Sequence, residues 1–268
     1  MNLYIDYGGT SFRYFLKKEL ITISSSTVSL IDFLDDMCKK YKNIKSISIS
    51  FAGQVQNGII KNAPNISIKE FDIKKYIEKK YNISLKIDND LNCAAIAEYK
   101  KYKNNYMALF YIGTGFGSAY IDNGKLIRGY RNQSGEIGHI PFVKTPFVCG
   151  CGRDDCIELS CSGSAIIKWC EYFNIEKEFQ RVDKLAKLDT PESRLILDNF
   201  YKALAYAFHT SNALFDFSLI VLGGSVGKNK EIKKFLKKQI QNTAFNKKDI
   251  SIKISTLENG SLEGTKFL

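Results

Sequence analysis

The chain contains two stretches of one design, in which a short apolar strand, a glycine turn and a second strand follow one another. Residues 3–15 carry the turn Gly8-Gly9-Thr10, and residues 107–121 carry the turn Gly113-Thr114-Gly115. Two such strands joined by a short turn form a hairpin, and glycine lets the turn come close to another group. The repeat therefore predicts two domains that begin in the same way.

Strands and helices alternate along the rest of the chain, as is typical of α/β proteins. Apolar residues at helical spacing predict helices over residues 69–81, 164–173 and 192–214. A chain of 268 residues can form one large domain or two of ordinary size. We expect two, over residues 1–104 and 105–268. The final residues either stay with the second domain or pack back on the first.

The composition is that of an ordinary globular protein, with 44% hydrophobic and 25% charged residues. No apolar run approaches the about 20 residues of a membrane span, and the N-terminus does not resemble a secretory signal. Seven cysteines, an odd number, fit a reducing compartment better than a disulfide framework. We therefore expect a soluble, cytoplasmic protein without a membrane partner.

The net charge of +11 raises the question of nucleic-acid binding. The lysines, however, are scattered in short groups such as Lys39-Lys40, Lys100-Lys101 and Lys237-Lys238, mostly on predicted polar helix faces or loops. Solvated faces therefore explain them better than a nucleic-acid partner, although the positive field favours anionic substrates.

One histidine and three cysteines lie in a short, glycine-broken loop: His139, Cys149, Cys151 and Cys156. Imidazole and thiolates suit a tetrahedral zinc ion, and four protein ligands leave no open position for water. The alternative is a set of free or redox-active thiols, but ligand type, number and spacing favour a structural zinc site. Zinc would then hold the neighbouring carboxylates of Glu136 and Glu158 in place.

Three glycine turns follow predicted strands: Gly8-Gly9-Thr10, Gly113-Thr114-Gly115 and Gly223-Gly224. Each can bring backbone N–H groups against phosphate, although any one alone is more often a plain turn. Together they predict a clamp on the phosphates of a nucleotide. Asp6, directly before the first turn, would hold Mg²⁺ directly or through water.

Asp90 lies where a predicted strand passes into a predicted helix. A carboxylate at such a junction can orient a hydroxyl and accept its proton during phosphoryl transfer. It can equally be a helix N-cap, a common role for aspartate, and the spacing does not separate the two interpretations. Asn89 and Asn65 are candidates for further hydrogen bonds to substrate hydroxyls.

The chain resembles the ROK (repressor, open reading frame, kinase) family, which includes bacterial sugar kinases and sugar-responsive repressors. The resemblance runs from Asp6 to nearly the C-terminus. It rests on DxGGT at 6–10, a loop at 53–65 that ends in Pro-Asn, Asn89-Asp90-x-Asn92-x-Ala94, GTGxG at 113–117, GExGH at 135–139, CxCGxxxCxE at 149–158 and LGG at 222–224.

The resemblance implies an actin-like, ribonuclease H-like fold with two domains and an interdomain cleft, in which ATP and Mg²⁺ are used to phosphorylate a sugar. It also implies a structural zinc and a homodimer. Asp90 becomes the catalytic base. The implied sugar ligands are Asn65, Asn89, Glu136, His139 and Glu158, so that His139 would bind zinc through one ring nitrogen and sugar through the other.

The chain departs from the family pattern in two places. Asp155 stands where glycine commonly precedes the last cysteine, which puts the loop geometry in doubt. Ser118-Ala119 replaces further glycines after GTGxG, and their side chains are expected to crowd a phosphate there. The chain begins at its first strand, without the winged helix-turn-helix of the family's repressors, so DNA binding is not expected.

Three functions follow from these patterns. The first is a glucokinase-like enzyme that uses ATP to phosphorylate a hexose hydroxyl, O6 of glucose above all. The second is a non-catalytic sugar sensor, which the crowded Ser118-Ala119 segment would favour. The third is a kinase for an N-acetylated hexosamine, N-acetylmannosamine or N-acetylglucosamine. The phosphoryl donor stays open between ATP and polyphosphate.

Overall fold

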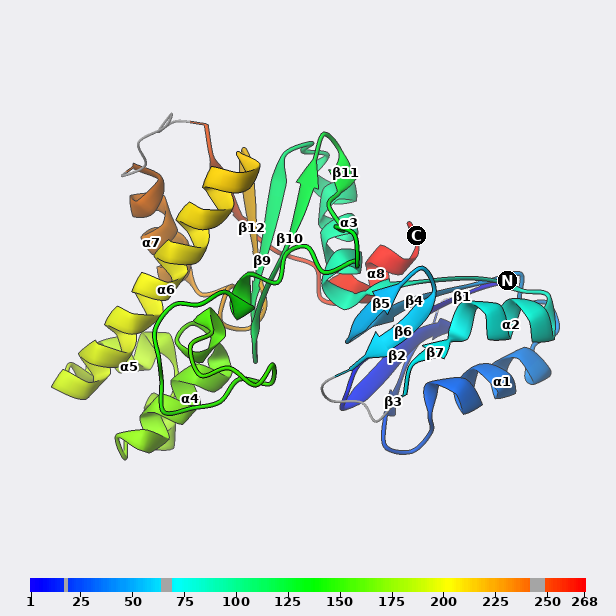
Figure 1. Ribbon diagram of the computed structural model, residues 1–268, viewed down its shortest axis with the longest axis horizontal. Coiled ribbons are helices and arrows are strands. Elements are labelled where there is room, and N and C mark those ends of the chain that lie inside the picture. Colours follow the sequence, from blue (N-terminus) through cyan, green and yellow to red (C-terminus); the bar gives the residue numbers. More distant parts are fainter. Residues whose placement is uncertain (17–18, 64–68, 242–248) are drawn as a thin grey trace. The chain divides into compact units, whose positions relative to one another are not determined.

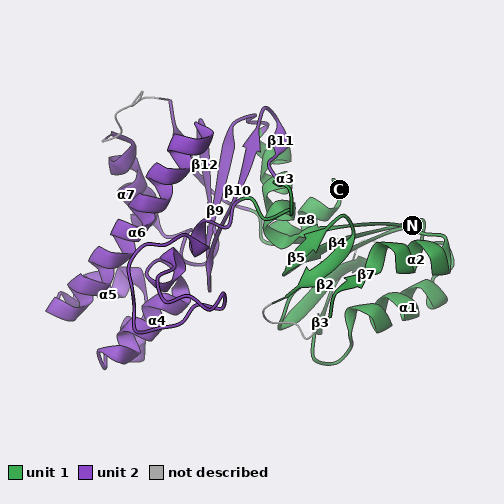
Figure 2. Ribbon diagram, in the orientation of Figure 1, with its two compact units in different colours: residues 1–102, 128–134, 257–268 green, residues 103–127, 135–256 purple. Residues whose placement is uncertain are grey.

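A computed structural model describes residues 1–16, 19–63, 69–241 and 249–268 of the chain (Figure 1). The chain divides into two compact units (Figure 2). Unit 1 comprises residues 1–102, 128–134 and 257–268, and unit 2 comprises residues 103–127 and 135–256. Unit 1 is therefore assembled from three separate parts of the chain.

The larger sheet of unit 1 has five strands in the order β3-β2-β1-β4-β8 among the described residues. β1 pairs antiparallel with β2 and parallel with β4, and β4 pairs parallel with the edge strand β8. A small antiparallel sheet of β5, β6 and β7 lies in the same unit. The strands are β1 Asn2–Tyr7, β2 Ser11–Leu16, β3 Glu19–Ser24, β4 Ser46–Phe51, β5 Gln54–Gln56, β6 Ile59–Asn62, β7 Phe71–Asp72 and β8 Ser84–Asn89.

The helices of unit 1 are α1 Leu30–Lys40, α2 Ile73–Tyr81, α3 Asp90–Tyr102 and α8 Gly260–Thr265. Buried residues of α1 and α2 join those of one sheet face in a core that includes Ile5, Ile47 and Ile49. Each of these three isoleucines is fully buried and contributes roughly 1.5–3 kcal/mol to stability. Alternating apolar residues in β1 and β4 therefore select the face that α1 and α2 cover.

The serines of β4 lie on the opposite face of the sheet, yet they are buried as well. Ser48 is 8% exposed and Ser50 is fully buried, because the C-terminal helix α8 packs on β1 and β4. Alternation of apolar and polar residues normally indicates a solvated face. Here the small serine side chains instead leave room for α8.

Helix α8 also packs closely on α3. A Cβ atom at Gly264 would lie 1.8 Å from the carbonyl oxygen of Cys93 in α3, so the two main chains touch directly. The last residues of the chain thus belong to the first unit, which requires glycine at this position.

The sheet of unit 2 repeats the plan of unit 1, with the order β11-β10-β9-β12-β13 among the described residues. β9 pairs antiparallel with β10 and parallel with β12, just as β1 pairs with β2 and β4. The two hairpins predicted from the sequence are therefore confirmed, and their glycine turns occupy equivalent places. The strands are β9 Met107–Ile112, β10 Phe116–Asp122, β11 Lys125–Leu126, β12 Leu219–Gly223 and β13 Ser251–Ile254.

The core of unit 2 is built around the long helix α6. Thr190 and Ser193 form a capping box at its start, with Pro191 as the first helical residue, which defines where the helix begins. Other helices surround it, together with short 3₁₀ turns at Ile137–His139, Ile157–Leu159 and Lys177–Phe179. The α-helices are α4 Gly163–Tyr172, α5 Val182–Leu188, α6 Pro191–Phe215 and α7 Lys230–Gln241.

The predicted α/β class is confirmed, and one predicted helix begins later than expected. Residues 71–72 form strand β7, and α2 starts at Ile73 because the Asp72 side chain accepts a hydrogen bond from the N–H of Lys75. In the described part of the chain, no helix combines the length and apolar character needed to cross a lipid bilayer.

A half-buried carboxylate joins α1 to α2. Asp35 accepts hydrogen bonds from the Tyr76 hydroxyl at 2.9 Å, the Tyr81 hydroxyl at 2.9 Å and Lys80 Nζ at 2.7 Å. Burial alone would raise the pKa of Asp35, but the hydrogen bonds from Lys80, Tyr81 and Tyr76 lower it below the ordinary value. The ionised form of Asp35 thus stabilises the folded state.

The contact between α8 and α3 predicts that Gly264→Ala destabilises the protein. The added methyl group must push α8 away from the Cys93 carbonyl, so the free energy of unfolding should fall by about 1–3 kcal/mol. Gly260→Ala is the matched control, because its nearest neighbour would lie at 3.7 Å. Urea denaturation measures both variants, and equal stability of the two would contradict the close contact.

The Asp35 interactions predict a stability difference that depends on pH. The pKa of Asp35 is lower in the folded protein than in the unfolded chain. The ionised carboxylate therefore stabilises the folded state at pH values above the unfolded pKa, and this stabilisation is lost as the pH falls through the folded pKa. The free energy of unfolding of the wild type should therefore exceed that of Asp35→Asn by roughly 1 kcal/mol at pH 7. This difference should disappear as the pH falls below about 4. Asp36→Asn, at an exposed neighbour, is the control. A difference that does not change with pH would refute the assignment.

Candidate functional site

The first glycine turn joins β1 to β2 and presents unused backbone donors. Its carbonyl groups are occupied, since Gly8 O accepts from Ser25 Oγ at 2.6 Å and Thr10 O accepts from the N–H of Ser25 at 3.0 Å. Among the described residues, the N–H groups of Gly9 and Thr10 have no hydrogen-bond partner. A turn whose carbonyl groups are hydrogen-bonded and whose N–H groups are available is suited to bind an anion.

Asp6, at the end of β1, already has a partner for each carboxylate oxygen. Oδ2 accepts from Arg13 Nη2 at 2.9 Å, and Oδ1 accepts from Ser50 Oγ at 2.7 Å. Arg13 Nη1 also donates to Asn259 Oδ1 at 2.6 Å, just before α8. The charge of Asp6 is thus balanced within unit 1, which fits a contact to Mg²⁺ through water better than direct coordination.

The junction of β8 and α3 shows which side chains accept from the first N–H groups of the helix, and Asp90 Oδ1 is one of the acceptors, at 2.9 Å from the N–H of Leu91. The Asn89 side chain accepts from the N–H groups of Leu91 at 2.9 Å and Asn92 at 3.3 Å, which is the geometry of an N-cap. Asn89 is therefore the cap, and Asp90 is the first residue of α3. Asn65, the other predicted amide ligand, lies outside the described residues.

Asp88 organises this junction, and sequence reasoning overlooked it. Its Oδ1 accepts from the N–H of Asn89 and from the side-chain amides of Asn92 and Asn132, at 2.8, 2.8 and 2.9 Å. Its Oδ2 accepts from Arg128 Nε at 3.0 Å and Nη2 at 2.8 Å. Asp88 thereby binds residues 128–134 to unit 1. Asp88-Asn89-Asp90 is visible in the sequence, but nothing there pairs it with Arg128.

The second and third glycine turns lie against each other in unit 2. The N–H groups of Val226 and Gly227, after β12, both donate to the carbonyl of Ile112 at 2.9 Å. A Cβ at Gly224 would lie 2.3 Å from the same oxygen. The start of α4 completes the group, because the N–H of Gly163 donates to Gly113 O at 2.7 Å. The second and third glycine turns thus form one continuous surface of backbone groups.

The glycines of the GExGH segment are explained by close contact with β10. A Cβ at Gly138 would lie 1.9 Å from Phe116 O, and a Cβ at Gly135 would lie 2.2 Å from Ser118 O. Gly135 also has a φ of +97°. Without side chains at these two positions, the segment rests directly on the strand and carries Glu136 and His139.

The expectation that Ser118 and Ala119 crowd the second turn is wrong. Ser118 is 3% exposed, and its hydroxyl lies 2.8 Å from both the Gly135 carbonyl oxygen and the Tyr120 hydroxyl. Ala119 is 1% exposed. The two residues belong to β10 and not to the turn itself, so their side chains lie on opposite faces of the strand, and both faces are covered at these positions. The sequence feature that favoured a non-catalytic sensor therefore disappears.

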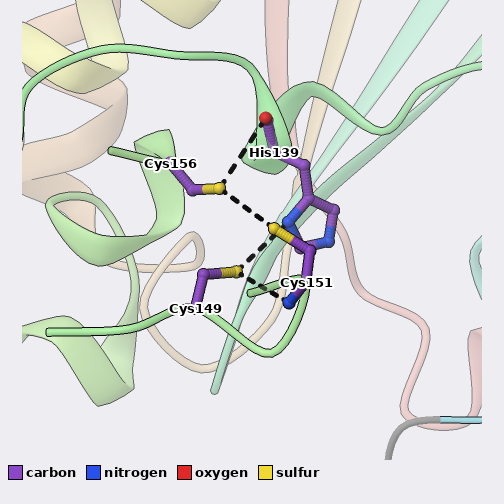
Figure 3. Close-up of side chains that lie close together, drawn as sticks. All are labelled: His139, Cys149, Cys151 and Cys156. Carbon is purple, nitrogen blue, oxygen red and sulfur yellow. Dashed lines mark hydrogen bonds between the residues drawn. The ribbon is translucent and has the colours of Figure 1, made fainter. Parts of the chain in front are cut away.

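His139 and the three loop cysteines come together as predicted (Figure 3). Cys149 Sγ lies 3.4 Å from His139 Nδ1, and Cys151 Sγ lies 3.4 Å from Cys156 Sγ. One ligand atom from each of the four residues lies within 4.8 Å of the others. Tetrahedral zinc places its sulfur and nitrogen ligands roughly 3.3–3.8 Å apart, so a small contraction would close the shell.

The chemistry of this donor set also fits a cation. Burial raises the pKa of the Cys149 thiol and raises that of Cys156 to about 11, so both are protonated at neutral pH without a metal. A coordinated cation displaces these protons and makes the sulfurs ligands. Four protein donors then complete the shell, as in a structural site.

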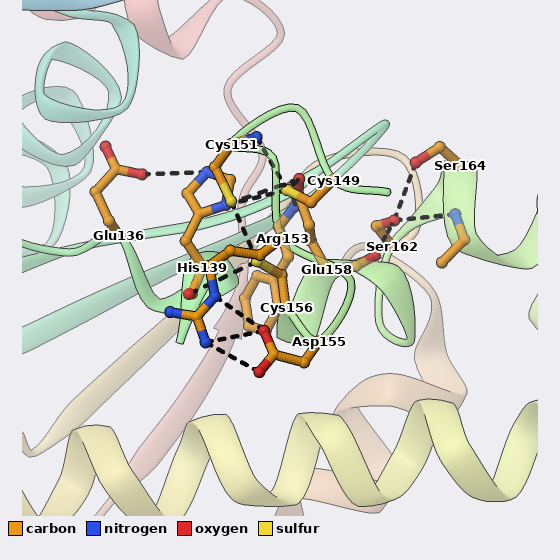
Figure 4. Close-up of polar contacts among 12 residues, drawn as sticks. Glu136, His139, Cys149, Cys151, Arg153, Asp155, Cys156, Glu158, Ser162 and Ser164 are labelled. Atoms are coloured by element: carbon orange, nitrogen blue, oxygen red, sulfur yellow. Dashed lines mark hydrogen bonds and ion pairs between the residues drawn. The ribbon is translucent and has the colours of Figure 1, made fainter. Parts of the chain in front are cut away.

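The cysteine loop keeps its form despite Asp155. The N–H of Phe142 donates to Asp155 O at 2.7 Å, and the Asp155 carboxylate accepts from Arg153 Nε at 2.9 Å and Nη2 at 3.0 Å (Figure 4). Asp155 is not among the residues with positive φ, so glycine is not required there. The geometric doubt raised by the sequence is thereby removed.

Glu136 and Glu158 lie on either side of His139 (Figure 4). Glu136 Oε2 is 3.8 Å from His139 Nε2, the ring nitrogen that faces away from the sulfurs. Glu158 Oε1 accepts from Cys149 Sγ at 2.9 Å, and its Oε2 lies 3.5 Å from the N–H of Phe116, beside the second glycine turn. The loop thus presents two carboxylates and one imidazole nitrogen, which can accept or donate hydrogen bonds to hydroxyl groups.

Comparisons of the sequence with known proteins all point to one protein family. The model of the ROK family matches residues 5–265. An N-acetyl-D-glucosamine kinase of Aliivibrio salmonicida is 30% identical over 214 residues, which cover 73% of this chain and 70% of the relative. A glucokinase of Streptomyces coelicolor is 34% identical over 134 residues, which cover 48% of this chain and 42% of that relative, less than half of its length.

Solved structures extend the likeness to the whole chain. A ROK family glucokinase from Streptomyces griseus, in complex with glucose and AMPPNP, superposes with a TM-score of 0.76 at 20% identity. The match covers 98% of this chain and 97% of the other. The actin-like, ribonuclease H-like fold expected from the sequence is therefore confirmed.

The cluster of His139 with three cysteines predicts about one zinc ion per chain. Cys151→Ser, at the exposed ligand, should lower the metal content after dialysis and weaken sugar binding before nucleotide binding, because the loop that carries Glu136 and Glu158 loses its brace. Cys38→Ser changes a buried cysteine outside the cluster and should keep the metal. Elemental analysis and sugar titration measure the effects. A metal-free wild type, or unchanged sugar affinity without metal, would contradict the prediction.

Proposed function

Because the chain belongs to the ROK family, we propose that it is a sugar kinase that transfers the γ-phosphoryl group of ATP to a hydroxyl group of a hexose. The observation that carries this proposal is the position of His139. Its Nδ1 lies among the zinc-type ligands, whereas its Nε2 faces Glu136. Nδ1 would thus serve the structural metal site, and Nε2 would face the surface that binds sugar hydroxyl groups.

The acceptor sugar would be held by Glu136, His139 and Glu158 in unit 2. Carboxylates accept hydrogen bonds from adjacent ring hydroxyls, and His139 Nε2 adds a further contact whose orientation depends on Nδ1. His139, Cys149, Cys151 and Cys156 would hold zinc, which when bound supplies only a brace, since four protein ligands leave no open position.

Asp90 would act as the general base in unit 1. The sugar oxygen bonds to the γ-phosphorus, the bond from that phosphorus to ADP breaks, and the hydroxyl proton passes to the Asp90 carboxylate. Asn89 fills the N-cap role of α3, and Asp90 Oδ1 also accepts from the N–H of Leu91 at 2.9 Å, which orients the carboxylate at the start of the helix. Asn89 Nδ2 donates to Gly53 O at 3.1 Å, which leaves its second N–H for a sugar oxygen. Asn65 remains a predicted ligand.

The glycine turns would bind the phosphates of ATP. In unit 1, the N–H groups of Gly9 and Thr10 suit an anion, and in unit 2 Gly113-Thr114-Gly115 adjoins Gly223-Gly224. Mg²⁺, when bound, neutralises charge on the phosphates, and Asp6 would orient one of its water molecules. A homodimer and a cytoplasmic location stay predictions from the resemblance and from cysteine usage.

The acceptor has two candidates. Glucose follows from the resemblance, and the Streptomyces glucokinase supports it. An N-acetylated hexosamine is the second candidate, because the match to the N-acetyl-D-glucosamine kinase covers more of the chain, 73% against 48%. Both acceptors require the same base and the same hydroxyl ligands.

A coupled assay for ADP release tests the proposal with glucose, N-acetylglucosamine and N-acetylmannosamine. Wild type should turn over at least one of them with ATP and Mg²⁺. Asp90→Asn should lower kcat on that sugar by about 10²–10⁴-fold while sugar affinity is retained, because only proton transfer is lost.

Asp36→Asn, an exposed carboxylate of α1, is the charge-matched control and should keep full activity. Sugar binding without ADP release in wild type would replace the kinase by a sensor. Normal turnover by Asp90→Asn would remove the assignment of the base while leaving the kinase in place.

A further inference from the structure

A cavity of about 450 Å³ lies beside β8, the edge strand of the unit 1 sheet. Every residue that lines it belongs to unit 1, and none of them is among the sugar or nucleotide ligands proposed above. Its volume is within the range of pockets that bind small molecules, roughly 300–1,000 Å³.

Segments far apart in the sequence build the walls, and hydrogen bonds join them. Gln56 Nε2 donates to Tyr130 O at 3.2 Å, and Asn132 Nδ2 donates to Val55 O at 2.8 Å. Lys86 Nζ donates to Leu268 O at 2.6 Å, which ties the end of the chain to β8. The cavity is thus held by polar contacts between well-separated parts of unit 1.

The charge in the cavity is positive. Lys74, Lys86 and Arg128 line it, against a single acidic side chain, Asp88. Asp88 is already compensated, because Arg128 donates to it through Nε and Nη2. Lys74 forms no ion pair with any described residue, and Arg128 Nη1 has no hydrogen-bond partner there. Lys86 uses one of its three N–H groups on Leu268 O, so it keeps two donors, and Lys74 adds a positive charge without an ion-pair partner among the described residues.

The rest of the wall is partly polar, with Gln56, Asn57 and Asn132, and partly apolar. Ile96 of α3 and Phe267 line the cavity together with Leu85 and Ile87 of β8. A ligand that matches both parts has an anionic group with several oxygens and a compact carbon skeleton. A phosphate ester fits best, because it carries a charge of about −1.5 to −2 and three acceptor oxygens, which two ammonium groups and a guanidinium can share.

We propose that this cavity is a binding site for a small phosphate monoester, separate from the sugar and nucleotide ligands. Lys74 and Lys86 provide the charge, and Arg128 Nη1 provides a further donor. The bound ligand would also act on residues 128–134, since Arg128 and Asn132 both bind Asp88. That segment leads directly into Glu136.

Asp88 also accepts from the N–H of Asn89, next to Asp90. A ligand on Arg128 would therefore change the hydrogen bonding around the proposed base, which makes the cavity an effector site. This effect on turnover rests on the proposed kinase function, whereas binding itself does not.

Phenyl phosphate is a suitable probe, because it is not a sugar and cannot use the hydroxyl ligands of the proposed active site, and saturating ATP without Mg²⁺ or sugar keeps it from the glycine turns that are proposed to bind phosphate. Isothermal titration at low salt should show saturable binding. Lys74→Gln and Lys86→Gln should each weaken it about tenfold or more, since each removes a charge-assisted hydrogen bond. Lys75→Gln, on the same helix but outside this cavity, is the control and should leave the affinity unchanged.

Benzoate and benzyl alcohol separate the contributions of phosphate, charge and ring. The proposal requires phenyl phosphate to bind more tightly than benzoate, and benzyl alcohol not to bind. The proposal would be overturned if phenyl phosphate did not bind, or if benzoate bound with the same affinity. It would also be overturned if neither lysine variant changed the affinity for phenyl phosphate. Asp90→Asn should bind phenyl phosphate as wild type does, so a failure here is distinct from a failure of the kinase proposal.

Discussion

Direct contact between main chains, at positions where a side chain is missing, supports the candidate site of unit 2. The segment that carries Glu136 and His139 has no regular structure beyond one 3₁₀ turn. It keeps its place because Gly135 and Gly138 rest on the carbonyl groups of Phe116 and Ser118. Any side chain there would lift the segment from β10 and displace both site residues. The predicted zinc ligands Cys149, Cys151 and Cys156 lie in the later part of the same loop.

Unit 1 depends on buried carboxylates instead. Asp6 is balanced by Arg13 and Ser50, and Asp88 accepts from five donor groups. Such buried charges are tolerated only when paired and fully hydrogen-bonded, and they then hold their surroundings in one arrangement. In this way Asp88 orders the start of α3 and residues 128–134 together.

The zinc-type cluster and the proposed chemistry are therefore distinct but connected. His139 belongs to both, through different ring nitrogens, and Glu158 lies between Cys149 and the N–H of Phe116 beside the second glycine turn. A metal in the cluster would act on sugar binding by holding these groups, without an open coordination position of its own.

The sequence by itself determined the α/β class, the repeated hairpins, the zinc-type ligands and the family, because these depend on residue type and on spacing over a few positions. Three things depended on tertiary structure. Asn89, whose side-chain amide donates to Gly53 O across 36 residues of sequence, caps α3, Ser118 points into the core, and Arg128 pairs with Asp88 across 40 residues of sequence. The cavity beside β8 belongs here too, since Lys74, Lys86 and Arg128 become neighbours only after folding. Local patterns record the chemistry that each segment can perform, whereas contacts between distant segments decide which residues actually meet.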